Sequence, residues 1–267
     1  MPRTEPIAAL GRRRADRLGL LLGLIGVTVF AVTLPATRIA VLELPPVFVT
    51  FGRIALAGLA AIPTLLVMRA PWPRRAQLPL LALVALGVVL GFPLLMALAM
   101  RTTDASHGGV VLAVLPLLTA VAAIPFGGER PSTLFWVCAA LGSAAVLAFA
   151  LLKSAGGLTG GDVLLLLAAA CAAVGYAAGA VLTRTMPGLA VVGWALVAIL
   201  PVALAVAWLD RPAEPLAASG AAWAGFLYVA LGSQLLGFLF WYRGLALGGI
   251  ARVGQVQLLQ TFLTLGF

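Results

Sequence analysis

Long apolar runs follow one another along almost the whole chain, and they limit the folds that it can adopt. A helix needs about 20 apolar residues to cross the hydrocarbon of a bilayer, where every backbone polar group must be bonded internally. Eight such runs lie at 18–37, 46–68, 78–100, 105–126, 133–152, 163–183, 189–208 and 220–242. A ninth run starts near residue 250. With 63% hydrophobic and 9% charged residues, the chain is predicted to be all-α, a polytopic transmembrane helix bundle.

Basic residues gather on one side of this predicted bundle. When the N-terminus is placed in the cytoplasm, residues 1–17 form a basic cytoplasmic segment, and four bases fall outside: Arg38, Arg101, Lys153 and Arg211. Twelve bases fall inside, namely Arg3, Arg12, Arg13, Arg14, Arg17, Arg69, Arg74, Arg75, Arg130, Arg184, Arg243 and Arg252. The positive-inside rule explains the net charge of +9, so no nucleic-acid partner is expected. Sixteen of the seventeen bases are arginine, which favours a bacterial inner (cytoplasmic) membrane.

Two segments far apart in the chain resemble each other. GVVLAVLPLLTAV at 109–121 aligns with GQVQLLQTFLTLG at 254–266, an offset of 145, with Gly, Val, Leu and Thr in common. The order of span lengths also agrees, which predicts one repeat at 18–152 (spans 1–5) and a second at 161–267 (spans 6–9). A repeat of five spans crosses the membrane an odd number of times, so the second copy starts on the opposite side and is inverted relative to the first. Such inverted repeats are typical of secondary transporters.

Four stretches carry a family resemblance: FGRIALAGLA at 51–60, TDASHGGVVLAVLPLLTAV at 103–121, GGER at 127–130 and WYRGLALGGIARVGQVQLLQ at 241–260. With them the sequence resembles the drug/metabolite transporter superfamily, and in particular its EamA-type transporters. The resemblance implies ten helices in two inverted five-helix repeats, and export of amino acids or other small metabolites. About nine of these helices are recognisable here, and we expect the native chain to continue into a tenth.

Arg53 is the base that this topology leaves inside a span, about 10 Å from the outer end at about 1.5 Å per residue. Its position matches the arginine that is common in helix 2 of the family. A charge at such depth costs about 2.5–3.5 kcal/mol unless it reaches a partner. Two interpretations stay open. Arg53 reaches Glu43 or Asp104 near the outer surface, or it faces a cavity and binds a substrate anion.

Other candidate substrate-binding residues lie in spans 6, 7 and 9. Gln257, Gln260, Thr261 and Thr264 share one helical face, which should point inward because polar groups are costly in lipid. Hydrogen bonding between helices and cavity lining both remain possible roles for this face. Tyr176 and Trp194 are aromatic candidates. Phe30, Trp241 and Tyr242 are further candidates for lining an aromatic cavity, although the place of Trp241 and Tyr242 at a span end favours an interfacial belt. The small residues of GYAAG at 175–179 predict a tight helix contact.

His107 is the sole histidine of the chain. It is a candidate for proton coupling, with a structural role near the interface as the alternative. The run DASHGG does not form a catalytic triad, because the adjacent Ser106 and His107 point about 100° apart on a helix. Asp104 is instead expected to be the N-cap of span 4. No Asp or Glu lies near the middle of a span, which favours uniport, exchange or coupling through His107 over a carboxylate relay.

The sequence therefore predicts a secondary transporter that exports small amphipathic metabolites such as amino acids by alternating access. No cofactor or metal is expected, and the expected partners are a small-molecule substrate and the lipid bilayer, with the chain acting as a monomer or homodimer. An intramembrane enzyme, either a lipid-modifying transferase or a protease, is one alternative, and a non-transporting membrane scaffold is another. The single histidine and the lack of an internal carboxylate or a GxSxG motif argue against the enzyme.

Overall fold

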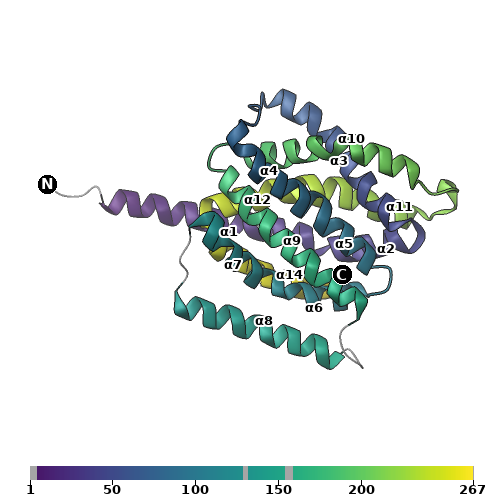
Figure 1. Ribbon diagram of the computed structural model, residues 1–267. Coiled ribbons are helices and arrows are strands. Elements are labelled where there is room, and N and C mark those ends of the chain that lie inside the picture. Colours follow the sequence, from purple (N-terminus) through teal and green to yellow (C-terminus); the bar gives the residue numbers. More distant parts are fainter. Residues whose placement is uncertain (1–4, 129–131, 154–158, 267) are drawn as a thin grey trace.

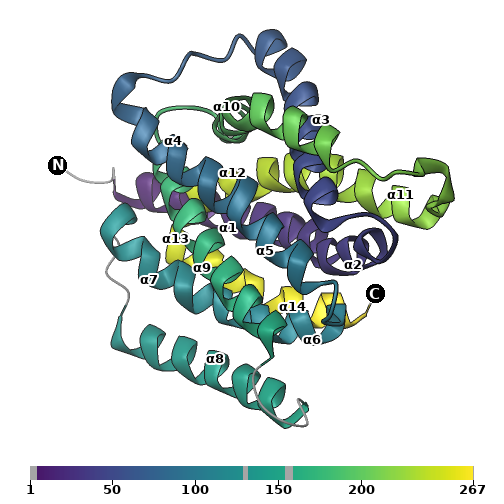
Figure 2. The ribbon, with the colours of Figure 1, turned by 45° about the vertical axis from the view of Figure 1, so that its right-hand side comes forward.

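The computed structural model describes residues 5–128, 132–153 and 159–266, which form a bundle of helices packed side by side (Figures 1 and 2). Every regular element within these ranges is helical, and seven helical segments are long and apolar enough to cross a membrane. Large apolar side chains such as Leu66, Val202 and Phe262 stay exposed on the outside, as expected of a surface that contacts lipid. The predicted all-α transmembrane bundle is confirmed.

Five successive helical segments make up the first half of the bundle. They are α1 (Glu5–Ala31) with α2 (Thr33–Glu43), α3 (Pro46–Val67), η1 (Arg75–Gln77) with α4 (Leu78–Val84), η2 (Ala85–Gly91) and α5 (Phe92–Ala99), α6 (Ala105–Val111) with η3 (Leu112–Val114) and α7 (Leu115–Gly127), and α8 (Thr133–Lys153). The first segment ends at Glu43, beyond its predicted end at 37. It continues through Arg38 because that side chain bonds the Met100 carbonyl and Asp104.

Four helical segments follow in the second half. They are α9 (Gly160–Leu182), α10 (Gly188–Leu209), α11 (Gly220–Leu227) with η5 (Tyr228–Gly237) and α12 (Phe238–Gly248), and α13 (Ile250–Gly254) with η6 (Gln255–Gln257) and α14 (Leu258–Leu265). A short turn of helix, η4 (Pro215–Ala217), precedes α11. The eighth run thus ends at Gly248, beyond the predicted 242, because α12 stays packed on α1 to its end.

Departures from α-helical geometry recur at the same places in the two halves. The π-helical segments η2 and η5 start at Ala85 and Tyr228, and the 3₁₀ segments η3 and η6 start at Leu112 and Gln255. Both pairs of starts lie 143 positions apart (85 to 228, and 112 to 255), two short of the offset predicted from the sequence. This agreement supports an internal repeat.

Helices of the two halves interleave in a symmetric pattern. The most extensive contact joins α3 to α10, the second span of each half. The first span of each half packs on the third span of the other, so α1 contacts α12, and α9 contacts α4, η2 and α5. Helix α8 lies at the edge of the bundle and packs mainly on α6, η3 and α7 (Figures 1 and 2). Any space at the centre is therefore walled by both halves.

Glycines in α9 allow its neighbours to approach closely. A Cβ on Gly175 would lie 3.0 Å from the Val88 backbone nitrogen, and one on Gly179 would lie 2.2 Å from the Tyr242 ring. The Tyr242 hydroxyl donates a hydrogen bond to the Gly175 carbonyl at 3.0 Å. The tight contact predicted from GYAAG is confirmed.

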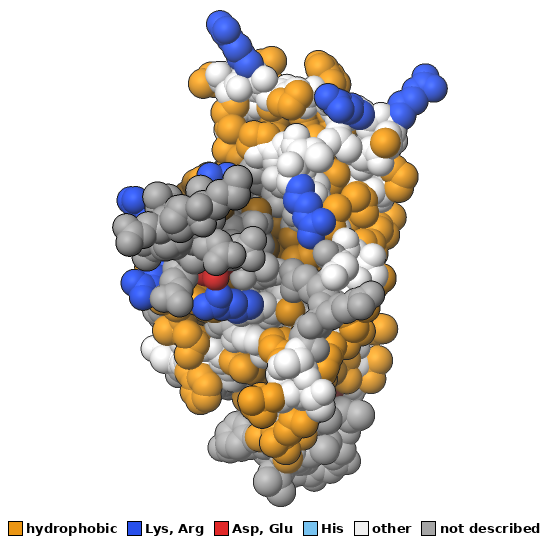
Figure 3. Space-filling view, turned by 90° about the vertical axis from the view of Figure 1, so that its left-hand side faces the viewer, with side chains coloured by type: hydrophobic (Ala, Val, Ile, Leu, Met, Phe, Trp, Pro, Cys, Tyr) orange, Lys and Arg blue, Asp and Glu red, His pale blue; other side chains and the backbone are white. Residues whose placement is uncertain are grey.

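The two ends of the bundle differ in charge. At the N-terminal end Arg252 pairs with Asp16 at 2.9 Å, and Figure 3, which faces this end, shows Lys and Arg side chains gathered on it. Exposed arginines of the segments that meet here are Arg14, Arg17, Arg69, Arg74, Arg75, Arg184, Arg243 and Arg252. At the opposite end Asp104 is the N-cap residue of α6, as predicted, but its carboxylate pairs with Arg38 at 3.3 Å and makes no cap hydrogen bond.

We expect Gly179→Ala to lower the free energy of unfolding by about 1–3 kcal/mol. The added methyl group overlaps the ring of Tyr242, which is fully buried and has no space to move into. Gly142→Ala in α8 is the matched control, because a Cβ there meets nothing within 4 Å. Thermal denaturation of both variants in detergent measures the difference, and equal melting temperatures would contradict the contact.

Candidate functional site

A narrow cavity, here called the central cavity, lies between the two halves of the bundle. Its lining side chains come from seven spans: Phe30, Thr33, Leu34, Arg53, Val88, Phe92, Met96, Leu112, Leu115, Tyr176, Ser233, Gln234, Phe238 and Gln260. The free space at its centre is about that of one water molecule. A larger ligand therefore fits only after the lining helices move apart.

Arg53 supplies the positive charge of this cavity. Its side chain is 2% exposed, its Nη2 donates to Ser233 Oγ at 3.4 Å, and its Nε has no partner. Thr33 Oγ1 also donates to Ser233 Oγ, at 2.9 Å. Arg53 is the charged member of an otherwise apolar, buried face of α3, on which Val49 and Ala57 lie one turn away on either side.

The predicted carboxylate partners of Arg53 are wrong. Glu43 accepts hydrogen bonds from the backbone and hydroxyl of Ser219 at 2.6 and 2.7 Å, and Asp104 pairs with Arg38. The side chain of Arg53 points into the bundle because its neighbours Gly52 and Ala57 pack against other helices and hold this face of α3 inward. Of the two interpretations, the geometry favours the cavity.

Aromatic rings form one wall of the central cavity. The Phe30 ring lies 5.1 Å from that of Phe238, and the Tyr176 ring lies 5.4 Å from that of Trp241. Trp241 and Tyr242 are both 0% exposed, so the predicted interfacial belt is wrong. The physical reason is that glycines on α1 and α9 leave room for these rings inside the bundle: Gly26 lies against the Trp241 backbone, and Gly179 lies under the Tyr242 ring.

A second small cavity adjoins the first and is called the Gln257 cavity. It shares Leu34, Leu112, Leu115 and Gln260 with the central cavity and adds Gly109, Gln257, Thr261 and Thr264. Thr261 and Thr264 donate hydrogen bonds of 3.0 Å to the carbonyls of Gly109 and Ala31. Gln257 is 3% exposed and its amide has no partner. The predicted inward face therefore serves both roles left open: the threonines join helices, and the glutamines line cavities.

Trp194 lies outside both cavities. Its indole nitrogen donates to the Pro71 carbonyl at 3.0 Å, and its ring stacks on Trp72 at 4.4 Å. These contacts fasten the loop after α3 to the start of α10. The structure does not bring Trp194 to the substrate-binding candidates Arg53 and Tyr176.

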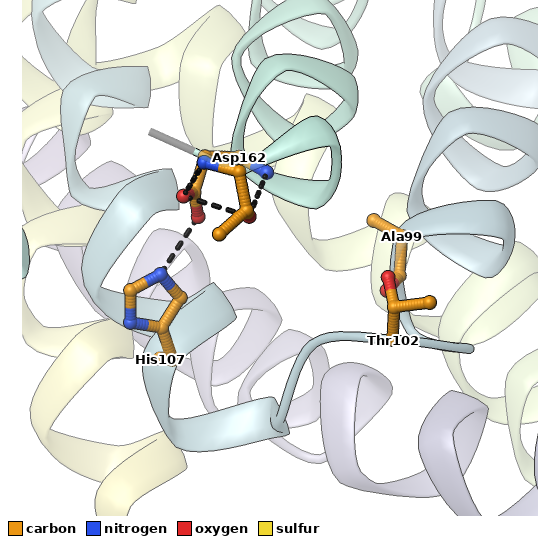
Figure 4. A network of polar contacts seen from close by, with 5 residues as sticks. Ala99, Thr102, His107 and Asp162 are labelled. Atoms are coloured by element: carbon orange, nitrogen blue, oxygen red, sulfur yellow. Dashed lines mark hydrogen bonds and ion pairs between the residues drawn. The ribbon is translucent and has the colours of Figure 1, made fainter. Parts of the chain in front are cut away.

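His107 also lies away from the cavities, near the opposite end of the bundle. Its Nε2 lies 2.7 Å from Asp162 Oδ1, and the side chains are 23% and 1% exposed (Figure 4). Asp162 also accepts hydrogen bonds from the backbone and hydroxyl of Thr159, which caps α9. The pair joins α6 of the first half to α9 of the second. Proton coupling through His107 stays a prediction.

Three polar residues of the central cavity were not predicted: Thr33, Ser233 and Gln234. Gln234 is 0% exposed, and neither atom of its amide has a partner. The signal that points to it is the polar pair Ser233–Gln234 in the middle of an apolar span, since polar residues at that depth face inward. The described residues contain no group of three His, Cys, Asp or Glu side chains that suits a metal ion.

Comparisons with known proteins agree with a transporter. The model of the EamA-like transporter family matches residues 17–151 and 159–267. The uncharacterized transporter YdeK of Bacillus subtilis (strain 168) is 45% identical over 244 residues, which cover 91% of this chain and 85% of YdeK. A solved crystal structure has the same fold, with a TM-score of 0.70 at 19% identity over 92% of this chain and 87% of that one.

We expect Arg53→Met to keep or raise the melting temperature, because it removes a buried charge that no described carboxylate balances and keeps the side-chain length. Arg38→Met is the matched control. It removes the ion pair with Asp104 and the bond to the Met100 carbonyl, and should cost about 1 kcal/mol. Thermal denaturation of the purified variants checks both values. A large loss for Arg53→Met would mean that Arg53 holds the bundle together.

Proposed function

The chain belongs to the EamA-like transporter family, and from its central cavity we propose that it exports small amphipathic metabolites such as amino acids by alternating access. Members of this family are secondary transporters that span the membrane several times. The observation that carries the proposal is the buried guanidinium of Arg53, which faces aromatic and apolar walls at the junction of the two halves. Such a cavity can bind the charged group of a small ligand through Arg53 and the apolar part of the ligand through its aromatic wall.

Weak polar links between the halves at both ends suit a rocking motion. At the opposite end Glu43 bonds Ser219, and the Phe48 N–H donates to Asp210 at 2.9 Å. At the N-terminal end Gln77 donates to Thr185 at 2.8 Å. Exposed polar links of this kind contribute about 0–1 kcal/mol each. Links of this kind can break at low cost at one end while the other end stays closed, which is what alternating access requires. The pair of His107 with the buried Asp162 is a further link at the opposite end, and it must also part when that end opens.

The π-helical segments support the same mechanism. Both η2 and η5 lie mid-span and line the central cavity, through Val88 in the first half and Ser233 and Gln234 in the second. A π segment interrupts the regular backbone ladder, and such sites allow a helix to bend. The two π segments lie at matching positions in the halves, so each half can bend next to the proposed substrate site.

The enzyme alternative lacks a chemical basis in the cavity. A nucleophilic Ser233 needs a neighbouring base, but its described partners are the guanidinium of Arg53 and the hydroxyl of Thr33, and neither accepts a proton readily. His107 is bonded to Asp162 outside the cavity. A scaffold without transport leaves the unpartnered polar groups of the cavity unexplained.

The charge difference between the ends supports an orientation in the bacterial cytoplasmic membrane with the N-terminus inside. The arginines of the N-terminal end outnumber those of the opposite end, where Arg38, Arg101 and Arg211 lie. Positive residues are enriched on the cytoplasmic side of membrane proteins.

We expect reporter fusions after residues 75 and 186 to report the cytoplasm, and fusions after residues 41, 157 and 213 to report the exterior. The inverted repeat requires 157 and 75 to lie on different sides. Alkaline phosphatase and fluorescent-protein fusions, which work on opposite sides, measure this directly. A cytoplasmic signal at 157 would overturn the repeat, and a reversal of all signals would overturn the orientation alone.

We expect cells that produce the protein to release one class of amphipathic metabolites faster than cells that produce a locked variant. Glu43→Cys with Ser219→Cys locks the opposite end after oxidation, and Gln77→Cys with Thr185→Cys locks the N-terminal end. Metabolite profiling of the medium gives the release rates, in a background without the native cysteines.

Each lock alone should stop release, and a reductant should restore it, because alternating access needs both ends to open in turn. The reduced double-cysteine protein is the matched control for each lock. Release that continues when either end is fully cross-linked would contradict alternating access. Equal release with and without the unlocked protein for every metabolite would contradict export.

A further inference from the structure

The central cavity carries one full positive charge and otherwise neutral polar groups. Arg53 has one hydrogen bond, to Ser233, and its Nε has none. Gln234 presents an amide without a partner, and Gln260 lies where the central cavity meets the Gln257 cavity. Neither cavity is lined by a carboxylate of the described residues.

The described carboxylates are all engaged or solvated elsewhere. Asp16 pairs with Arg252, Glu43 bonds Ser219, Asp104 pairs with Arg38, Asp162 bonds His107 and Thr159, Asp210 accepts from the Phe48 N–H, and Glu214 is exposed. Moving any of the first five to Arg53 would break a link at an end of the bundle, and Glu214 lies in the exposed loop before α11. The positive charge of the cavity is therefore left for a ligand.

The geometry of Arg53 suits a carboxylate ligand in particular. A guanidinium binds a carboxylate through two parallel N–H groups. The free Nε–H of Arg53 can serve as one of these two groups. Its bond to Ser233 at 3.4 Å is long, so it yields easily to a charged acceptor. The hydroxyls of Thr33 and Ser233 already bond each other at 2.9 Å, which holds the Ser233 hydroxyl beside Arg53.

The same cavity is a poor site for an ammonium group. A buried cation needs a carboxylate or several carbonyl oxygens to replace its water. The side chains of the lining offer neutral oxygens, from the amides of Gln234 and Gln260 and the hydroxyls of Thr33, Tyr176 and Ser233. The rings of Phe30, Tyr176 and Phe238 attract cations weakly, but Arg53 repels a second positive charge in the same confined space. Arg53 thus matches the carboxylate of a zwitterion, but no charged group of the cavity matches its ammonium group.

We propose that the central cavity takes its substrates as monocarboxylate anions with an apolar body and a neutral polar group, in preference to zwitterions. Arg53 binds the carboxylate, and the amides of Gln234 and Gln260 bind the neutral group. Phe30, Tyr176 and Phe238 contact the apolar body. This inference rests on the proposed function, because it takes the cavity to be the transport site. It narrows the metabolites to a charge class that amino acids, as zwitterions at neutral pH, match less well than anions do.

Matched pairs of ligands in three sizes test the charge class, so that the test does not depend on which size of substrate the cavity prefers. The 2-oxo acids pyruvate, 4-methyl-2-oxopentanoate and phenylpyruvate keep the body and carboxylate of alanine, leucine and phenylalanine and replace the ammonium with a neutral carbonyl. Isothermal titration of the purified protein in lipid nanodiscs at neutral pH gives the six dissociation constants. In at least one pair, the 2-oxo acid should bind at least tenfold more tightly than its amino acid.

Variants separate the role of Arg53 from general folding. Arg53→Gln should abolish the tenfold preference, and Arg53→Lys, which keeps the charge without the planar fork, should restore part of it. Arg38→Gln is the matched control and should leave the preference unchanged, because Arg38 pairs with Asp104 outside the cavity. Elution as a single species and a melting transition confirm that each variant is folded.

Two results would overturn the proposal: an amino acid that binds as tightly as its 2-oxo acid in every pair, or no binding by any of the three anions. Either result leaves export and alternating access to be judged by the cross-linking experiment, which does not depend on the charge of the substrate. If release continues in the cross-linked proteins but the preference for anions is intact, alternating access is contradicted and the assignment of the substrate site stands.

Discussion

The buried guanidinium of Arg53 is the constraint on which the rest of the central cavity depends. A charge in the middle of a membrane protein needs a partner or a path to water, and the described part of the chain gives Arg53 only the hydroxyl of Ser233. Five of the six carboxylates whose side chains the structure describes form links at an end of the bundle, and the sixth, Glu214, is exposed. The described part of the fold therefore places one charge at its centre with no carboxylate to balance it, and our proposal is that a bound anion supplies that balance.

Close packing around this charge comes from glycines and from breaks in the helices. Gly26 and Gly179 let Trp241 and Tyr242 turn inward, where they pack behind the lining rings of Tyr176 and Phe238. The segments η2 and η5 interrupt the third and eighth spans at matching positions and bring side chains of both halves to Arg53. Rigid contacts between paired helices and flexible points beside the cavity thus come from the same repeat, as a transporter that rocks around a central site requires.

The sequence was sufficient to predict which runs form helices, because length and hydropathy set them, although the first and eighth runs extend beyond their predicted ends. The partners of Arg53 were predicted wrongly. Ser233 lies 180 positions away in the chain, and only the packing of α3 against η5 brings the two together. Trp241 and Tyr242 were misplaced for a similar reason: an aromatic pair near a span end looks the same in sequence whether it faces lipid or glycines on the next helix.

Access of water to Ser233 from each side of the membrane tests the central claim most directly. Ser233→Cys, with Cys138 and Cys171 replaced by alanine, can be treated with a membrane-impermeant thiol reagent in right-side-out and in inverted vesicles. The proposed mechanism predicts modification from both sides, slowed in both by a transported ligand, because in that mechanism one central site opens to each side in turn. Modification from one side alone, or from neither, would contradict alternating access around the cavity of Arg53.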